Sequence, residues 1–234
     1  ARGLASARPS GRGSAGELRD RWVDWLAHAA PLGAVALAAR LLFWPTLWWN
    51  KFRHGRQGGG TRWYDEVADG LVLGALPDAA LARRLAEDER VVGVVNMVAE
   101  WRGPESTYKE LGVEQLWLPI VDFTSPSPED LERAVHWIQE RAVAGKRVYV
   151  HCKAGKGRSA TVAMAYLVAS QGLTAREAQE RLVARRPQVL KSLYARPEVA
   201  EFCRRRGEAA QAAEGGSPAE AKSGAGQGPP ASEV

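Results

Sequence analysis

The sequence predicts an α/β fold with a mainly parallel central sheet and helices on both faces. Strand-like and helical segments alternate through the middle of the 234-residue chain, which is typical of a parallel sheet flanked by helices. Residues 91–97 are apolar almost throughout, as expected for a strand that is covered on both faces. A glycine-containing loop joins the last strand-like segment to an apolar helix. Folds of this class bind ligands at such carboxyl ends of strands.

Four segments carry strand signals: residues 71–73, 91–97, 114–118 and 147–150. Between them, Ala79–Glu87 and residues 129–144 have apolar positions at helical spacing. Residues 161–169 form the apolar helix after the loop.

A further helix is expected to begin at a capping box formed by Thr174 and Glu177. It should end near Arg185, because Pro187 follows.

The loop between the last strand and the apolar helix reads His-Cys-Lys-Ala-Gly-Lys-Gly-Arg-Ser over residues 151–159. Backbone N–H groups of residues 153–158, Ala154 among them, can turn inward as a nest for phosphate oxygens. Gly155 and Gly157 permit this curl because glycine tolerates positive φ. Arg158 adds a planar fork of donors, and the helix that begins there points its positive end at the anion.

The same surroundings favour ionisation of Cys152. Helix N-termini and nearby cations lower thiol pKa values to roughly 3.5–7.5, so Cys152 should be a thiolate at neutral pH. A thiolate inside a phosphate cradle is placed for in-line attack on phosphorus, which gives a thiophosphate intermediate. Ser159 could donate a hydrogen bond to the thiolate and ease its departure, and His151 should orient the loop. The alternative is a buried structural cysteine beside an ordinary glycine turn.

Ester hydrolysis also requires a proton for the leaving oxygen. Residues 116–123 read as a strand running into a loop, with Asp122 at its end, thirty residues before Cys152. Asp122 is therefore the predicted general acid, and could later act as the base for water. Glu129 and Asp130 compete for the role, but they follow Ser127-Pro128 and are expected to complement a helix dipole. A plain loop role for Asp122 stays open.

Composition limits the other functions open to the chain. With two cysteines, at 152 and 203, there is no disulfide framework, and Cys203 is expected to be a bystander. Four scattered histidines without a Cys/His cluster argue against a zinc site, and no metal or other cofactor is expected. The net charge of +5 comes from residues 1–60, which alone carry +6, so it argues poorly for nucleic-acid binding by the rest of the chain.

The N-terminal part, residues 1–60, is predicted to be a basic leader followed by a membrane-associating segment. The first sixteen residues hold three Arg, three Ser and no acidic residue, which is typical of an organellar transit peptide. The alternative is a disordered leader that carries no targeting signal. Residues 29–49 are apolar but are interrupted by Arg40 and Pro45, and residues 22–49 hold five of the nine tryptophans. Because Trp favours the headgroup zone, an interfacial helix is predicted, with a helix packed on the catalytic domain as the alternative.

The remaining boundaries follow from composition. Residues 57–60 read as a linker, residues 61–206 as the catalytic domain, and residues 207–234, which lack aromatics, as a disordered tail.

The loop resembles the C-x5-R signature of cysteine-dependent phosphatases. The Val121-Asp122 element, without a preceding Trp-Pro, resembles their dual-specificity branch. Further strings, within residues 40–200, resemble the mitochondrial PTP-like phosphatidylglycerophosphate phosphatases and their plant relatives. These strings are Leu42-Phe43-Trp44-Pro45-Thr46-Leu47, Trp63-Tyr64-Asp65, Val72-Leu73-Gly74-Ala75-Leu76-Pro77, Gly112-Val113-Glu114-Gln115-Leu116 and Tyr149-Val150-His151-Cys152-Lys153-Ala154-Gly155.

The resemblance implies a dual-specificity-type fold, with Cys152 as nucleophile, Arg158 as phosphate binder and Asp122 as general acid. It also implies hydrolysis of phosphatidylglycerophosphate to phosphatidylglycerol, and association with the mitochondrial inner membrane or, alternatively, a chloroplast or other organellar membrane. Animal members carry a Glu-Glu-Tyr-Glu string where residues 99–104 read Ala-Glu-Trp-Arg-Gly-Pro, which bears on headgroup preference. Phosphoprotein or phosphoinositide hydrolysis and a non-catalytic phosphate-binding role are the alternatives.

Two lysines of the loop, Lys153 and Lys156, bear on the substrate. On the rim they would attract a headgroup with more than one negative charge, such as that of an anionic phospholipid. Both could instead face solvent.

Overall fold

The computed structural model describes residues 31–56, 62–143 and 145–215, and its core is a five-stranded sheet. The strands are β1 (Tyr64–Ala68), β2 (Leu71–Gly74), β3 (Val91–Asn96), β4 (Glu114–Trp117) and β5 (Arg147–His151). They lie in the order β1-β2-β5-β3-β4; β1 is antiparallel to β2 and the other neighbours are parallel. The mainly parallel sheet is confirmed. The predicted leader and linker lie outside the described residues.

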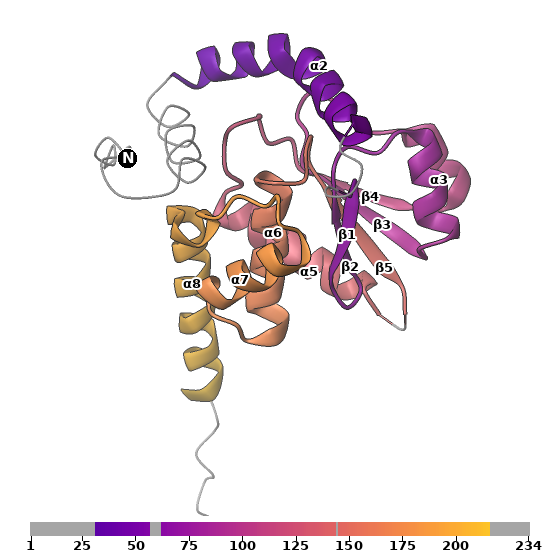
Figure 1. Cartoon of the computed structure of the whole chain (residues 1–234). Helices are drawn as coiled ribbons and strands as arrows, with labels where there is room; N and C mark the ends of the chain where they lie inside the picture. Colours follow the sequence, from indigo (N-terminus) through magenta and orange to yellow (C-terminus); the bar gives the residue numbers. More distant parts are fainter. Residues whose placement is uncertain (1–30, 57–61, 144, 216–234) are drawn as a thin grey trace, which may run out of the picture.

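Helices cover both faces of the sheet. On one face lie α3 (Ala79–Glu87) and α4 (Glu105–Leu111). On the other lie α5 (Pro128–Arg141), α6 (Arg158–Gln171), α7 (Ala175–Arg185) and α8 (Pro197–Gly215), with a short 3₁₀ turn at Leu193–Ala195. Figure 1 shows α3 on one side of the strands and α5 to α8 on the other.

The two faces of β5 show how alternation divides the core. Val148 and Val150 pack in the larger cluster beneath α5 and α6, whereas Tyr149 points into the smaller cluster beside α3 and α4. Helix α6 is buried along most of its length, so the loop that precedes it is held between a central strand and a buried helix.

Helix α2 (Leu32–Arg56) extends across the carboxyl edge of the sheet. Its Phe43 and Leu47 pack against Leu76 and Val98, which follow β2 and β3. Pro45 lies inside the helix, where it donates no backbone hydrogen bond, and Figure 1 shows the helix bending part-way along.

One face of α2 therefore packs on the domain, which was the alternative to an interfacial helix, while Leu41, Trp44 and Trp48 remain exposed. None of the described helices combines the length and the apolar character needed to cross a bilayer.

The prediction of disorder from residue 207 onward is wrong for its first part. Helix α8 continues to Gly215, since residues 208–214 consist of Ala, Glu and Gln, which are strong helix formers. Phe202 and Val199 anchor this helix in the core. The rest of the predicted tail, residues 216–234, lies outside the described residues.

Candidate active site

The loop from Cys152 to Gly157 leaves the carboxyl end of β5, the central strand of the sheet, and leads directly into α6. Gly157 caps the helix, whose first residue is Arg158. The positive end of α6 thus points at the loop, as the sequence predicted.

Cys152, the predicted nucleophile, is buried, with only 3% of its surface exposed. The hydroxyl of Ser159 donates a hydrogen bond to Sγ over 3.2 Å. Burial opposes ionisation, but the charge of Arg158 and hydrogen bonds from Ser159 and the Ala154 backbone outweigh it, and they lower the pKa of Cys152 to about 7. About half of the thiol is therefore ionised at neutral pH, at the upper end of the predicted range.

Arg158 and Asp122 meet directly above the loop. Nη2 of Arg158 lies 2.8 Å from Oδ1 of Asp122, while Nη1 donates to the Ile120 carbonyl oxygen at 2.7 Å. These bonds tie the guanidinium to the segment that carries Asp122. The carboxylate thus occupies Nη2, a guanidinium donor that a phosphate would use.

Lys153 is a second cation of this site. Its Nζ donates to Oδ2 of Asp122 at 2.8 Å, and only 4% of the residue is exposed. Of the two predicted rim lysines, Lys153 therefore points into the site, whereas Lys156 is half-buried and its carbonyl accepts a hydrogen bond from the Leu190 backbone.

Asp122 is held as a carboxylate by these partners. Burial raises its pKa, but Arg158 and Lys153 outweigh that effect, so the pKa lies below its ordinary value. Phe123, the next residue, has a φ of 66°, a left-handed conformation that is uncommon outside glycine. The backbone N–H of Phe123 donates to Oδ1 of Asp122 at 3.1 Å.

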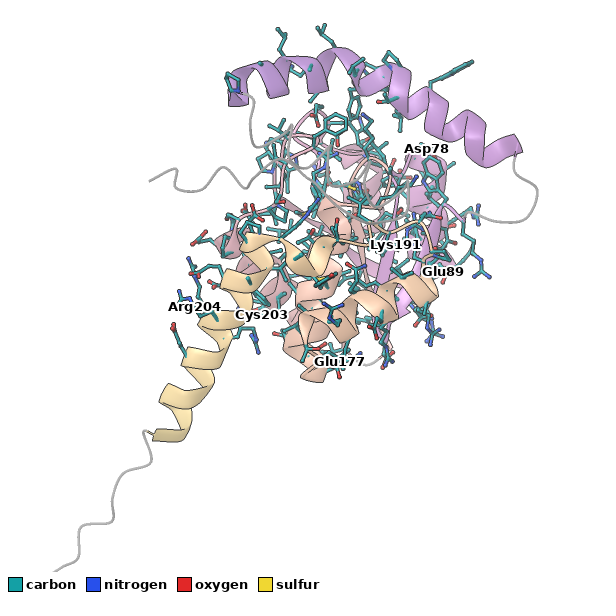
Figure 2. The ribbon with its side chains drawn as sticks, turned by 60° about the vertical axis from the view of Figure 1, so that its left-hand side comes forward. Asp78, Glu89, Glu177, Lys191, Cys203 and Arg204 are labelled. Carbon is teal, nitrogen blue, oxygen red and sulfur yellow. The ribbon has the colours of Figure 1, made fainter. Side chains whose placement is uncertain are left out.

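The competing acids take other roles. Asp130 forms a capping box with Ser127 at the start of α5, and Glu129 pairs with Arg205 at 2.7 Å. Cys203 lies on α8, as Figure 2 shows, and burial raises the pKa of its thiol. None of these three residues forms part of the cluster around Cys152.

The two loop glycines differ in their backbone. Gly155 has a φ of +67°, and a Cβ there would lie 2.5 Å from the Gly74 carbonyl oxygen. Gly157 has a φ of −112°, so the prediction of positive φ at both glycines is wrong for Gly157, because there the chain is already turning into the helix.

His151 supports the loop from below. It is fully buried, its ring stacks on Tyr149, and Nδ1 lies 3.3 Å from the Cys152 carbonyl oxygen. Burial lowers the pKa of His151 to about 3, so the ring is neutral, in keeping with an orienting role.

Sequence reasoning missed two residues of this region. Arg186, at the end of α7, is fully buried and donates to the Gly155 carbonyl oxygen at 2.9 Å and to Asp65 at 2.7 Å. Glu100 lies 3.8 Å from Arg158 and accepts a 3.4 Å hydrogen bond from the Asp122 backbone. The only available signals were an arginine beside Pro187 and a lone acid after β3, neither of which is specific.

Comparison with known proteins identifies the family. The description "Dual specificity phosphatase, catalytic domain" matches residues 72–204. The chain belongs to the dual specificity phosphatase family. The predicted cysteine-phosphatase fold is confirmed with it.

Similar proteins of known name indicate the branch of the family to which the chain is related. The chain is 41% identical to "Phosphatidylglycerophosphatase and protein-tyrosine phosphatase 1" of Rattus norvegicus, over 62% of this chain and 78% of the relative. It is 37% identical to "Phosphatidylglycerophosphate phosphatase PTPMT2" of Arabidopsis thaliana, over 73% and 75% of the two chains. A solved structure of PTPMT1 in complex with PI(5)P superposes with a TM-score of 0.56 at 32% identity, and covers 65% of this chain and 99% of that one.

Proposed function

We propose that this protein is a cysteine-dependent phosphatase that hydrolyses phosphatidylglycerophosphate to phosphatidylglycerol. The observation that carries the proposal is the juxtaposition of a Cys152 thiol with a pKa of about 7 and an anion site formed by Arg158 and Lys153, which Asp122 fills at rest.

Substrate binding reorganises this site. A phosphate dianion takes the donors of Arg158 and the loop amides, and displaces the Asp122 carboxylate. Once separated from its cations, buried Asp122 retains the effect that raises its pKa, so it can hold the proton that the leaving oxygen needs.

The reaction then proceeds in two displacements. Sγ of Cys152 forms a bond to phosphorus while the bond to the lipid oxygen breaks, and Asp122 gives its proton to that oxygen. Water next attacks the phosphocysteine, Asp122 accepts its proton, and Sγ departs as a thiolate that the Ser159 hydroxyl stabilises. Inorganic phosphate and the lipid alcohol are the products.

A lipid substrate is supported by the second cation and by the relatives. Lys153 lies beside Arg158 and adds positive charge where a phosphorylated headgroup would enter. Two similar proteins are named for phosphatidylglycerophosphate hydrolysis, and a third was solved with PI(5)P. The rat relative is also named a protein-tyrosine phosphatase, which keeps phosphotyrosine as the second candidate.

The place of action is part of the proposal. The basic, serine-containing leader supports delivery to mitochondria, with the chloroplast as the alternative, and the exposed tryptophans of α2 support association with the inner membrane. Fractionation of cells that express the full chain, followed by carbonate extraction, tests both. Recovery in the cytosolic fraction would contradict the location.

A substrate panel tests the activity. The purified chain and a Cys152→Ser control are assayed for phosphate release from phosphatidylglycerophosphate, a phosphoinositide and a phosphotyrosine peptide, with the lipids in detergent micelles. The proposal expects the highest kcat/KM for phosphatidylglycerophosphate, and no release by the control. Rapid turnover of the peptide without lipid turnover would overturn it.

A further inference from the structure

Helix α2 contacts the phosphate-binding loop as well as the domain surface. The Nζ of Lys153 lies 5.2 Å from the centre of the Phe43 ring, within the range of a cation–π interaction. The same Nζ bonds to Asp122 on its other side. One side chain of α2 therefore helps to hold the second cation of the active site.

Helix α2 packs on the domain through one row of its described side chains. Among the side chains of α2 that the structure describes, Ala39, Phe43 and Leu47 are buried, and they are spaced four residues apart along one face of the helix. Phe43 and Leu47 pack with Leu76 and Val98, and partly buried Trp101 lies against this cluster. Because the described contact is one row of side chains, a ligand that binds the opposite face of α2 can change the population in which the helix is packed on the domain.

That other face is apolar and exposed. Leu37, Leu41, Trp44 and Trp48 are exposed by 60%, 69%, 64% and 74%. Figure 2 shows side chains of α2 projecting away from the domain as well as toward it. A bilayer and the domain can thus bind the helix simultaneously, each on its own face.

The charge of α2 favours binding of its exposed face to a lipid bilayer rather than to a groove on another protein. The helix carries Arg40, Lys51, Arg53 and Arg56 and no acidic residue. Tryptophan beside basic residues is the composition that binds the headgroup zone of anionic membranes.

We propose that α2 is a membrane-responsive regulator of the active site: binding of its exposed face to an anionic bilayer keeps Phe43 seated on Lys153 and thereby raises catalytic efficiency. The inference rests on the proposed function only in placing the substrate at a membrane. Because Phe43 contacts Lys153 and affects the reaction through that side chain, it is a positioning residue.

The test uses a soluble substrate, so that it is independent of lipid hydrolysis. The full chain hydrolyses p-nitrophenyl phosphate with or without vesicles of phosphatidylcholine and phosphatidylserine, which contain no phosphomonoester. Co-sedimentation measures binding, and vesicles of phosphatidylcholine alone test the role of charge. We expect binding to the anionic vesicles and a rise in kcat/KM of at least about twofold, with an upper value of about thirtyfold, the ratio that corresponds to a buried cation–π contact.

Variants distinguish the binding of α2 to vesicles from the effect of that binding on catalysis. Combining Leu41→Ala with Trp44→Ala should weaken vesicle binding at least about tenfold and abolish activation, while leaving the rate without vesicles unchanged. Val143→Ala, an exposed apolar position before β5 at the opposite edge of the sheet, should change neither. Phe43→Leu should bind vesicles normally but lose the activation.

Each failure has a distinct meaning. Binding without activation, or activation retained in Phe43→Leu, overturns the coupling. Unchanged binding in the double variant overturns docking through this face, and so does binding only to a purified protein partner. Absence of phosphatidylglycerophosphate turnover in micelles contradicts the proposed function and leaves these results as they stand.

Discussion

Replacing Ser159 with alanine tests how the loop activates its nucleophile. Ser159 is fully buried and its hydroxyl lies 3.2 Å from the sulfur of Cys152, so its removal deprives the thiolate of a buried hydrogen-bond donor. A hydrogen bond to a charged group contributes about 1.5–3 kcal/mol, and about 1.4 kcal/mol corresponds to one pH unit. The pKa of Cys152 should therefore rise from about 7 to roughly 8–9. At pH 7 the thiolate fraction would fall from about half to between about 1% and 10%.

The assay is the rate of iodoacetamide alkylation of Cys152 against pH, read by mass spectrometry in a Cys203→Ala background. In the parent protein kcat/KM should rise with pH through about 7. In Ser159→Ala both this rise and the midpoint of alkylation should shift to higher pH. Ser170→Ala is the matched control, since it removes a hydroxyl bonded to the Tyr166 carbonyl in the last turn of α6, remote from the sulfur. An unchanged alkylation midpoint in Ser159→Ala would refute the reasoning.

Three further substitutions test other parts of the site. Asp122→Asn should slow hydrolysis of an alkyl phosphate about 10²- to 10⁴-fold but slow an activated aryl phosphate far less; equal slowing in steady-state assays would remove it from the acid role. Gly155→Ala should abolish activity and lower the denaturation midpoint more than Gly172→Ala, which has a similar φ of +65° but open space around its Cβ; equal effects would contradict the close approach to the Gly74 backbone. Arg186→Leu should lower the free energy of unfolding in urea by about 3–5 kcal/mol, because it removes the buried partner of Asp65, which keeps the exposed Arg62 at 3.8 Å, whereas Arg185→Leu at the exposed neighbouring position should change it little; similar losses in the two variants would contradict a supporting role for Arg186.

The parts of the fold that the sequence predicted were those with strong local signals. Helix α3 was located to the residue, and the strand core of 91–96 was recognised from its apolar run. The edge strand β1 was missed because its Tyr64-Asp65-Glu66-Val67-Ala68 sequence includes two acids and pairs on one side only. Its strand character depends on β2, a tertiary partner that no short window reveals.

The same distinction holds within the site. Cys152, Arg158 and Ser159 lie within residues 152–159, the loop and the first turn of α6, and their spacing alone predicts that they meet around one anion. Asp122 was located by its position after a strand, and the structure places its carboxylate within 2.8 Å of both Arg158 and Lys153. Arg186 contacts this loop from 31 residues along the chain, and its role arises only once the chain has folded.

The most direct test of the central claim is to look for the phosphocysteine itself. The protein is mixed with phosphatidylglycerophosphate, quenched within the first turnover and digested, and the peptide that contains Cys152 is examined by mass spectrometry. The mechanism predicts a phosphate on Cys152 that forms before phosphatidylglycerol and phosphate accumulate, and that persists longer in Asp122→Asn. Hydrolysis of the lipid with no phosphate on Cys152, or with phosphate on another residue, would contradict it.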